Sequence, residues 1–186
     1  MKELKDEELV LLSQKGDKQA FGELIERYKG MIFTMINRIL GDPSIADDVA
    51  QDVFIRAYKA LPRFRKEAKF STWLHRICYN LCITTVKKRR KEVDLSYRME
   101  QYQNSIEMAY ERKEIQEKVR WLISELSPIY SSAITLRHIH GLSYKEISEI
   151  LGQPLGTTKS TILRAREQLK KLALEKIGWD VIKEVL

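Results

Sequence analysis

The sequence has few cysteines and no long hydrophobic segment. Cys78 and Cys82 are its only cysteines, and their four-residue spacing falls inside a helical pattern. A redox or metal site needs more ligands than these two, so we expect both to be buried as small apolar side chains. Residues 1–12 are charged and form no long apolar run, which argues against a signal peptide or a membrane anchor. We therefore expect a cytoplasmic protein that does not insert into a membrane.

The sequence also lacks a set of residues with the spacing of a metal site. His138 and His140 flank a single residue in an apolar stretch, but no cysteine or acidic residue has the spacing that would complete a zinc site. Packing in the core or at the surface is their expected role. Two carboxylates among Asp47, Asp48 and Asp52 could share a magnesium ion, as in a nuclease, yet no supporting acid, base or lysine constellation accompanies them. We expect no metal, no cofactor and no catalytic residue.

The sequence also lacks any extended alternation of polar and apolar residues. Apolar residues recur at helical spacing instead, which predicts an all-α fold. With 186 residues, of which 44% are hydrophobic, the chain can bury a core as one domain or as two small ones. Its 33 basic residues exceed its 26 acidic residues, giving a net charge of +7. This balance favours a polyanionic partner.

Capping residues and glycines divide the chain into helices. In the first half we predict helices over residues 6–15, 17–41, 42–61 and 71–88. Asp17 and Asp42 can cap the second and third of these, while Gly41 ends the second. In the second half, helical spacing resumes by residue 115, and a further helix is predicted over residues 128–141.

A segment without periodicity separates the two halves. Residues 92–106 gain Gln, Asn, Ser and Tyr, a composition typical of a linker. Residues 92–113 contain five acidic and three basic residues, so we do not expect them to lie on DNA. We predict two small helical domains joined by a flexible linker and followed by a tail, with the boundaries 1–91, 92–113, 114–175 and 176–186.

Residues 143–169 have the pattern of two helices joined by a tight turn. Ser143 and Glu146 fit a capping box, and Gly152 suits the left-handed C-terminal position of the first helix. One face of the second helix carries hydrogen-bond donors from Thr157, Lys159, Ser160, Thr161, Arg164 and Arg166. This face has no acidic residue before Glu167, which a plain helical hairpin does not explain. The pattern predicts a helix-turn-helix whose second helix enters the major groove.

The helix predicted over residues 42–61 has an acidic face. Its apolar residues form two neighbouring rows, and the remaining face carries Asp47, Asp48, Gln51 and Asp52. Acidic side chains complement the positive end of the helix dipole, which accounts for Asp47 and Asp48 but poorly for Asp52. Because such a face repels DNA phosphates, we expect it to bind a protein.

Residues 63–76 interleave aromatic and basic side chains. Such a surface suits single-stranded DNA, because cations follow the backbone while rings stack on unpaired bases. Phe70 and Trp73, taken singly, are expected to pack in the core of an amphipathic helix. The basic run at residues 87–91 favours a DNA-binding surface for the segment as a whole.

Three segments appear in order across both halves: residues 46–58 (ADDVAQDVFIRAY), 70–74 (FSTWL) and 155–160 (LGTTKS). Together they resemble bacterial RNA polymerase sigma factors of the extracytoplasmic-function (ECF) group of the sigma-70 family. The resemblance implies a transcription factor, not an enzyme, that binds core RNA polymerase, directs it to specific promoters and promotes their opening, in a stress response. Its first half would open the −10 element, its second half would read the −35 element, and the linker would pass near the RNA exit path.

The resemblance also implies roles for individual residues. Docking on the clamp coiled coil of the largest catalytic subunit is implied for Asp48, Gln51, Asp52 and Ile55. The loop at residues 63–69 would capture a flipped-out base, and the −10 strand would be contacted by Arg63, Phe64, Arg65, Lys66, Lys69, Trp73, Arg76 and Asn80. The −35 duplex would be contacted by Thr157, Lys159, Ser160, Thr161 and Arg164. Contact with the polymerase flap and an anti-sigma partner that covers these surfaces are implied as well.

Two positions depart from the family pattern. The family often has a basic residue at the position of Thr161 and an acidic residue near Thr84 or Thr85, so a promoter sequence preference is not carried over. One other function stays open: an autonomous helix-turn-helix regulator, whose first half serves dimerisation or ligand sensing. Such a regulator binds a specific duplex without polymerase, whereas a sigma factor forms a stoichiometric complex with core RNA polymerase.

Overall fold

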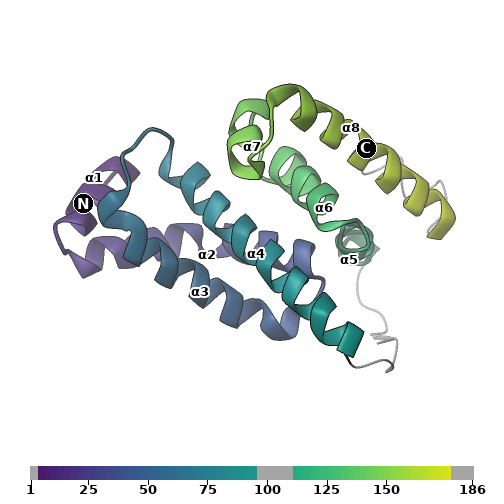
Figure 1. Cartoon of the computed structure of the whole chain (residues 1–186), viewed down its shortest axis with the longest axis horizontal. Helices are drawn as coiled ribbons and strands as arrows, with labels where there is room; N and C mark the ends of the chain where they lie inside the picture. The colour runs from purple at the N-terminus through teal and green to yellow at the C-terminus, as the bar shows by residue number, and fades with distance from the viewer. Residues whose placement is uncertain (1–3, 96–110, 177–186) are drawn as a thin grey trace.

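Two groups of helices make up the protein (Figure 1). The computed structural model describes residues 4–95 and 111–176, and this part of the chain contains helices but no strand, which confirms the predicted all-α class. The first group comprises α1 (Asp6–Gln14), α2 (Lys18–Leu40), η1 (Pro43–Ile45), α3 (Ala46–Ala60), η2 (Leu61–Arg63) and α4 (Phe70–Leu95). The second comprises α5 (Glu111–Ser124), α6 (Pro128–Ile134), η3 (Thr135–Ile139), α7 (Tyr144–Leu151) and α8 (Leu155–Lys176). No helix in the described ranges is both long and apolar enough to cross a membrane.

The predicted caps position the helices of the first group. The Asp17 carboxylate accepts hydrogen bonds from the backbone N–H groups of Gln19 and Ala20, at 2.8 and 3.1 Å. Gly41 ends α2 with φ at +65°, a left-handed conformation that favours glycine. Asp42 caps the next segment by accepting from the N–H of Ser44 at 2.9 Å. These capping predictions are confirmed, although the first turn after Asp42 is the 3₁₀ helix η1.

The helix predicted over residues 128–141 changes its geometry part-way. After α6 the chain makes the π-helical turn η3, in which the N–H of His140 donates to the carbonyl of Thr135 at 3.0 Å. Gly141 then ends the turn with φ at +66°. The wider turn shifts the side chains after it around the helix, because a π-helical turn holds more residues than an α-helical one.

The helices around the predicted linker extend into it. α4 continues to Leu95, beyond the predicted end near residue 88, and α5 begins at Glu111. Residues 96–110, which form most of the predicted linker, and the tail at residues 177–186 lie outside the described residues. The domain boundaries therefore stay a prediction.

Each group of helices has buried apolar residues of its own. The first group buries at least one large side chain from each α-helix, including Val10, Leu24, Ile36, Val53 and Leu74. The second group has a smaller cluster that joins α5, α6 and α8, formed by Ile123, Leu126, Ile134 and Ala165. Burial of these rows follows from the helical spacing of apolar residues in the sequence.

The two groups also share a core. Buried residues of η3 and α7, among them Leu136 and Ile147, belong to the same cluster as the core of the first group. α7 packs on α4, while α5 and α6 pack on α2. The hydroxyl of Ser131 donates to the backbone carbonyl of Arg38 across this boundary at 2.5 Å. The sequence predicted two tethered domains, and the structure adds a packed interface between them.

Leu136→Ala should destabilise the protein by about 2 to 5 kcal/mol, because truncating a buried leucine loses apolar contacts and leaves a cavity. Leu136 is 0% exposed, whereas Leu163 of α8 is 57% exposed and provides the matched control. We expect Leu163→Ala to change the free energy of unfolding by no more than about 0.5 kcal/mol. Urea denaturation followed by circular dichroism measures both variants. Equal losses would show that Leu136 does not lie in a well-packed core.

Candidate protein and nucleic-acid interfaces

The acidic face of α3 is exposed. Asp47, Asp48, Gln51 and Asp52 lie at the surface, and Ile55 is 42% exposed. Helical spacing places positions 48, 51, 52 and 55 on one stripe. The apolar rows of the same helix are buried in the core. The four residues that the resemblance assigns to polymerase docking, at positions 48, 51, 52 and 55, thus form one continuous strip of surface.

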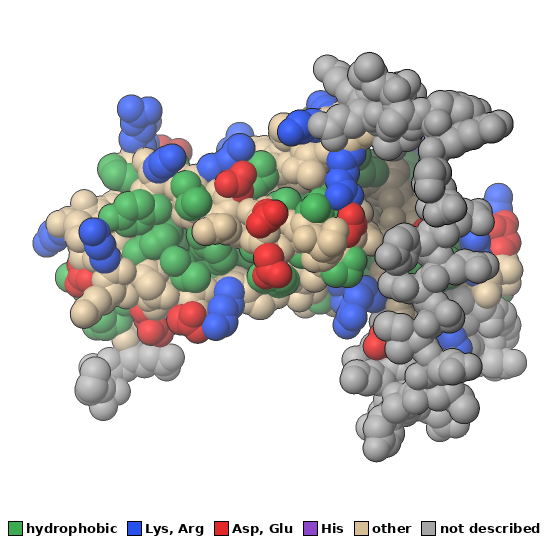
Figure 2. Space-filling model, turned by 90° about the horizontal axis from the view of Figure 1, so that it is seen from below, with side chains coloured by type: hydrophobic (Ala, Val, Ile, Leu, Met, Phe, Trp, Pro, Cys, Tyr) green, Lys and Arg blue, Asp and Glu red, His purple; other side chains and the backbone are tan. Residues whose placement is uncertain are grey.

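A shallow hydrophobic groove runs beside this strip, between α2 and α3. It has a volume of about 540 Å³, and its lining includes Phe21, Ile25, Phe54, Ile55 and Tyr58. The rings of Phe21 and Tyr58 lie 4.9 Å apart. Figure 2 shows hydrophobic side chains gathered on one face of the molecule, next to acidic side chains. An exposed apolar patch with a charged rim is typical of a protein-binding site.

An aromatic cluster fixes the loop between η2 and α4. Phe64 in the loop packs on Phe70 and Trp73 of α4, with ring centroids 6.2 and 4.8 Å apart. The side-chain amide of Gln14 in α1 donates to the carbonyls of Leu61 and Phe64, at 2.9 and 3.0 Å. Phe70 is buried and Trp73 is half-buried, which confirms their expected packing. The ring contacts and the hydrogen bonds from Gln14 therefore fix the start of the loop on α1 and α4.

Exposed basic side chains lie along this loop, namely Arg63, Arg65, Lys66 and Lys69. On α4, positions 73, 76 and 80 share one face by helical spacing. Arg76 and Asn80 are exposed on that face, while Trp73 also joins the aromatic cluster. The loop and this face of α4 form a cationic surface with partly accessible rings, as single-stranded DNA requires.

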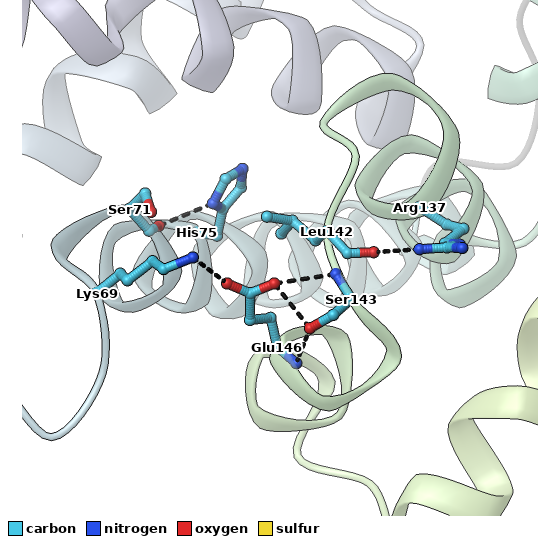
Figure 3. Close-up of polar contacts among 7 residues, drawn as sticks. All are labelled: Lys69, Ser71, His75, Arg137, Leu142, Ser143 and Glu146. Atoms are coloured by element: carbon cyan, nitrogen blue, oxygen red, sulfur yellow. Dashed lines mark hydrogen bonds and ion pairs between the residues drawn. The ribbon is translucent and has the colours of Figure 1, made fainter.

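A cavity of about 610 Å³ lies between the loop, α1 and α7. Its lining contains three basic residues, Lys66, Lys69 and Lys145, and five acidic ones, Asp6, Glu7, Glu67, Glu146 and Glu149. Lys69 forms a salt bridge with Glu146 at 3.0 Å (Figure 3). The loop thus faces carboxylates that the second group of helices supplies.

The helix-turn-helix has the predicted caps. The hydroxyl of Ser143 accepts a hydrogen bond from the N–H of Glu146 at 3.3 Å, and the Glu146 carboxylate accepts one from the N–H of Ser143 at 2.9 Å (Figure 3). The hydrogen bonds from Ser143, together with the one from Lys69, lower the pKa of Glu146 to about 2. Gly152 ends α7 with φ at +64° and turns the chain into α8.

The exposed face of α8 contains most, but not all, of the residues assigned to DNA. Thr157, Lys159, Ser160 and Arg164 lie at the surface. Thr161 is only 8% exposed, and its hydroxyl donates to Oε1 of Gln153 at 3.2 Å. The prediction that Thr161 faces DNA is wrong, because helical spacing places it on the buried row with Ile162 and Ala165. Its role is to tie the turn to α8.

Comparison with known proteins identifies the family. Residues 24–92 match Sigma-70 region 2, and residues 116–169 match Sigma-70, region 4. The RNA polymerase sigma-H factor of Pseudomonas aeruginosa is 38% identical over 178 residues, which cover 89% of this chain and 92% of that protein. The ECF RNA polymerase sigma factor SigW of Bacillus subtilis is 36% identical over 170 residues, covering 85% of this chain and 91% of that protein. The chain belongs to the ECF group of sigma factors.

A solved structure has a similar fold. CnrH in complex with the cytosolic domain of CnrY has a TM-score of 0.69 and 25% identity, covering 92% of this chain and 98% of that one. The region 2 match contains α3 and the basic loop, and the region 4 match contains the helix-turn-helix. The protein is a sigma factor that directs RNA polymerase to specific promoters, and the autonomous regulator is not favoured.

The cysteines of this sigma factor, together with His75 and His140, are packing residues. Cys78 and Cys82 are fully buried, as expected, and their mutual hydrogen bond and burial raise the pKa of Cys78. His138 is exposed, whereas Nδ1 of His140 lies 2.8 Å from Nε2 of His75 in α4. These two residues are 65 positions apart, so no local sequence pattern predicts their contact. Within residues 4–95 and 111–176, no three or more His, Cys, Asp and Glu side chains are grouped so that they could hold a metal ion.

Glu146→Gln should destabilise the sigma factor at neutral pH, because glutamine still accepts a hydrogen bond but carries no charge for the helix N-terminus or for Lys69. The pKa of Glu146 is lowered from 4.5 to about 2. The advantage of the wild type is therefore full above pH 4.5 and is lost as the pH falls towards 2. Denaturation at a series of pH values measures this difference. Glu149→Gln on the same helix is the control, and a difference for Glu146→Gln that does not vary with pH would contradict the role of the charge.

Proposed function

We propose that the α3 surface docks this sigma factor on the clamp coiled coil of the largest subunit of core RNA polymerase. The groove between α2 and α3 offers apolar contact, and the strip of Asp48, Gln51, Asp52 and Ile55 offers a charged rim. An acidic strip repels DNA phosphates, so a basic protein surface is the fitting partner. The observation that carries the proposal is the continuity of this strip with the groove, since Gln51 and Ile55 belong to both.

The loop and α4 surface is proposed to bind the melted −10 strand. Flipping out a base costs a few kcal/mol of stacking, which a protein must offset with ring contacts and hydrogen bonds. The loop is held by its aromatic base and by Gln14, so its contacts need little ordering on binding. The residues proposed to contact the strand are Arg63, Phe64, Arg65, Lys66, Lys69, Trp73, Arg76 and Asn80.

The second helix of the helix-turn-helix is proposed to read the −35 duplex. Its first turns are exposed and carry Thr157, Lys159, Ser160 and Arg164, which can donate to phosphates and base edges. Thr161 is left out of this set because it is buried. The second half is also proposed to contact the polymerase flap, so that one chain binds polymerase at two places.

We further propose which part of the chain binds each partner. Residues 1–91 bind polymerase and the −10 element, residues 92–113 link the halves, residues 114–175 bind the −35 element, and residues 176–186 form a tail. The protein catalyses no reaction of its own, and it acts in the cytoplasm, where promoter DNA and polymerase are found.

An anti-sigma factor is proposed as the inhibitory partner. Support comes from the sigma factor RpoE of Bartonella quintana, which has a similar fold and was solved in complex with the anti-sigma factor NepR. The groove between α2 and α3 is accessible to an amphipathic helix, since Ile55 and Tyr58 are 42% and 40% exposed. Such a partner would compete with polymerase for the same surface.

Reversing the charges of Asp48 and Asp52 to lysine should weaken the affinity for core polymerase by at least about tenfold, because like charges at an interface repel. Both side chains are exposed, so the fold should be retained. The matched control is the double reversal of Glu7 and Glu26, two exposed acidic residues of the first half that lie outside the α3 strip. Binding to core enzyme is measured by fluorescence anisotropy with labelled sigma factor. Equal affinity of the Asp48 and Asp52 variant and the wild type would remove α3 from the docking surface.

Arg164→Ala should weaken binding to a cognate −35 duplex by about 1 to 3 kcal/mol if the guanidinium reads a base. Leu163→Ala is the control, because Leu163 is 57% exposed on the same helix and has no hydrogen-bond donor in its side chain. Electrophoretic mobility shifts with cognate and scrambled duplexes measure both variants in holoenzyme. A loss that is the same on both duplexes would indicate a phosphate contact, and no loss on either would remove Arg164 from the interface.

A further inference from the structure

The turn of the helix-turn-helix carries a glutamine that is held by both its backbone and its side chain. Gln153 lies between Gly152, which ends α7, and Pro154, which restricts the backbone of the residue before it. Its N–H donates to the carbonyl of Ser148 at 3.1 Å. Its side-chain Oε1 accepts from the hydroxyl of Thr161 at 3.2 Å, eight residues further along the chain. The side chain of Gln153 therefore lies along the first turns of α8.

The hydroxyl of Thr161 does not use the usual acceptor of a hydroxyl in a helix. Serine and threonine in a helix commonly donate to the backbone carbonyl four residues earlier. Thr158 does so at 3.1 Å, and so does Ser160 at the same distance. Thr161 donates to the side chain of Gln153 instead. Because Thr161 is only 8% exposed, its hydroxyl holds this amide and is not offered to a partner molecule.

Thr161 lies at the border between the buried and the exposed sides of α8. Successive residues of a helix are rotated by about 100°, so position 161 is about 40° from position 157 on one side and about 40° from position 165 on the other. Thr157 belongs to the exposed face, whereas Ala165 is buried. A side chain held by Thr161 therefore lies at the edge of the surface that is proposed to meet the −35 duplex.

The amide group of Gln153 has only donors left to offer. Its Oε1 is engaged, and the two polar bonds of a planar amide diverge, so the hydrogen bond from Thr161 turns Nε2 away from the buried row. Within the described residues Nε2 donates to no other group, and it is not buried. Both N–H bonds of this amide are therefore accessible to a partner.

We propose that Gln153 donates a hydrogen bond from Nε2 to a phosphate of the −35 duplex, and that Thr161 is the positioning residue that orients its amide. The inference rests on the proposed function, because it needs the exposed face of α8 to meet DNA. A phosphate oxygen accepts hydrogen bonds and donates none, which matches an amide that offers only N–H groups.

The same constraint argues against a base as the partner. Glutamine recognises adenine by donating and accepting at once, which requires both Oε1 and Nε2. Here Oε1 is engaged by Thr161. Gln153 also precedes α8, and the first residues of the second helix are the ones that reach base edges in a helix-turn-helix. The contact therefore positions the helix on the duplex and carries no sequence information.

Fixing the amide before DNA arrives strengthens the contact. A glutamine side chain that moves freely in solution loses rotamer freedom when it binds, and this loss weakens binding. The hydrogen bonds to Ser148 and from Thr161 already restrict Gln153 in the free protein. Removing the hydroxyl of Thr161 should therefore weaken DNA binding although this side chain does not touch DNA.

Binding of holoenzyme to promoter duplexes over a series of salt concentrations tests the proposal. Gln153→Ala should weaken binding by about three- to tenfold, which corresponds to the loss of one hydrogen bond. The factor should be the same on a duplex with the cognate −35 element and on one with a single base-pair substitution in it. Because the amide is neutral and releases no counterion, the slope of log K against log[salt] should not change.

Thr161→Val should weaken binding by about two- to fivefold, because valine has nearly the same shape but cannot hold the amide. In the double variant with Gln153→Ala, the loss should be no larger than for Gln153→Ala alone, since the hydroxyl acts only through the amide. Losses that multiply would show that the two side chains act independently, and the positioning role would be wrong. Circular dichroism at the assay temperature checks that each variant is folded.

A lysine at the same position gives a result that a loss of folding does not imitate. Gln153→Lys should steepen the salt slope by about 0.9, because one ammonium group placed at a phosphate releases about one counterion. Gln19→Lys adds the same charge at an exposed glutamine of the first half and should leave the slope unchanged. Equal slopes for Gln153→Lys and the wild type would overturn the phosphate contact.

Arg164→Ala separates the failure of this inference from the failure of the proposed function. If Arg164→Ala weakens binding and Gln153→Ala does not, the amide does not contact the duplex and only the inference is overturned. If neither variant weakens binding, the α8 surface does not meet the −35 element, and the proposed function fails as well. A loss for Gln153→Ala on the cognate duplex alone would indicate a base contact and contradict the phosphate.

Discussion

α4 packs against the loop, the core of the first half and the second half of the chain, and these contacts determine where the functional surfaces lie. Four consecutive residues have four different surroundings: Trp73 joins the aromatic base of the loop, Leu74 is in the core, His75 faces the second half, and Arg76 is exposed. A helix makes this possible because each residue is rotated by about 100° from the one before. His75 is polar and buried, so it needs a hydrogen-bond partner, and His140 supplies it. The burial of one side chain thus couples region 2 to region 4.

Features that depend on nearby residues were predictable from the sequence. Asp17, Gly41 and Ser143 act within three or four positions of themselves, so a cap can be recognised without knowledge of the fold. The exposed strip of α3 followed from helical spacing, since its apolar rows leave only one face for Asp48 and Asp52. On α8 the apolar rows predict the buried face less well, because Thr161 is a polar residue that lies on the buried side. Hydrophobicity alone assigns such a residue to the wrong face.

Features that depend on packing between distant segments were not predictable. His75 and His140 are 65 residues apart, and Lys69 and Glu146 are 77 apart, so no local pattern connects them. The groove between α2 and α3 combines residues of two helices, and Phe21, Ile25 and Phe54 of its lining look like ordinary core positions in each sequence segment. Tyr58 shows the difficulty, because it lies four residues after the buried Phe54, on the same side of α3, and is nevertheless 40% exposed at the rim of the groove.

The contacts between the halves differ in how readily they can be replaced. The side chain of Lys69 is 76% exposed, and such surface salt bridges contribute only about 0.2 to 1 kcal/mol, so a DNA phosphate can take the place of Glu146 at little cost. The histidine pair and the shared apolar core are buried, and separating them exposes hydrophobic surface at about 25 cal/mol per Å². The buried histidine pair and the shared apolar core, and not the exposed salt bridge, therefore contribute most to holding the two halves together.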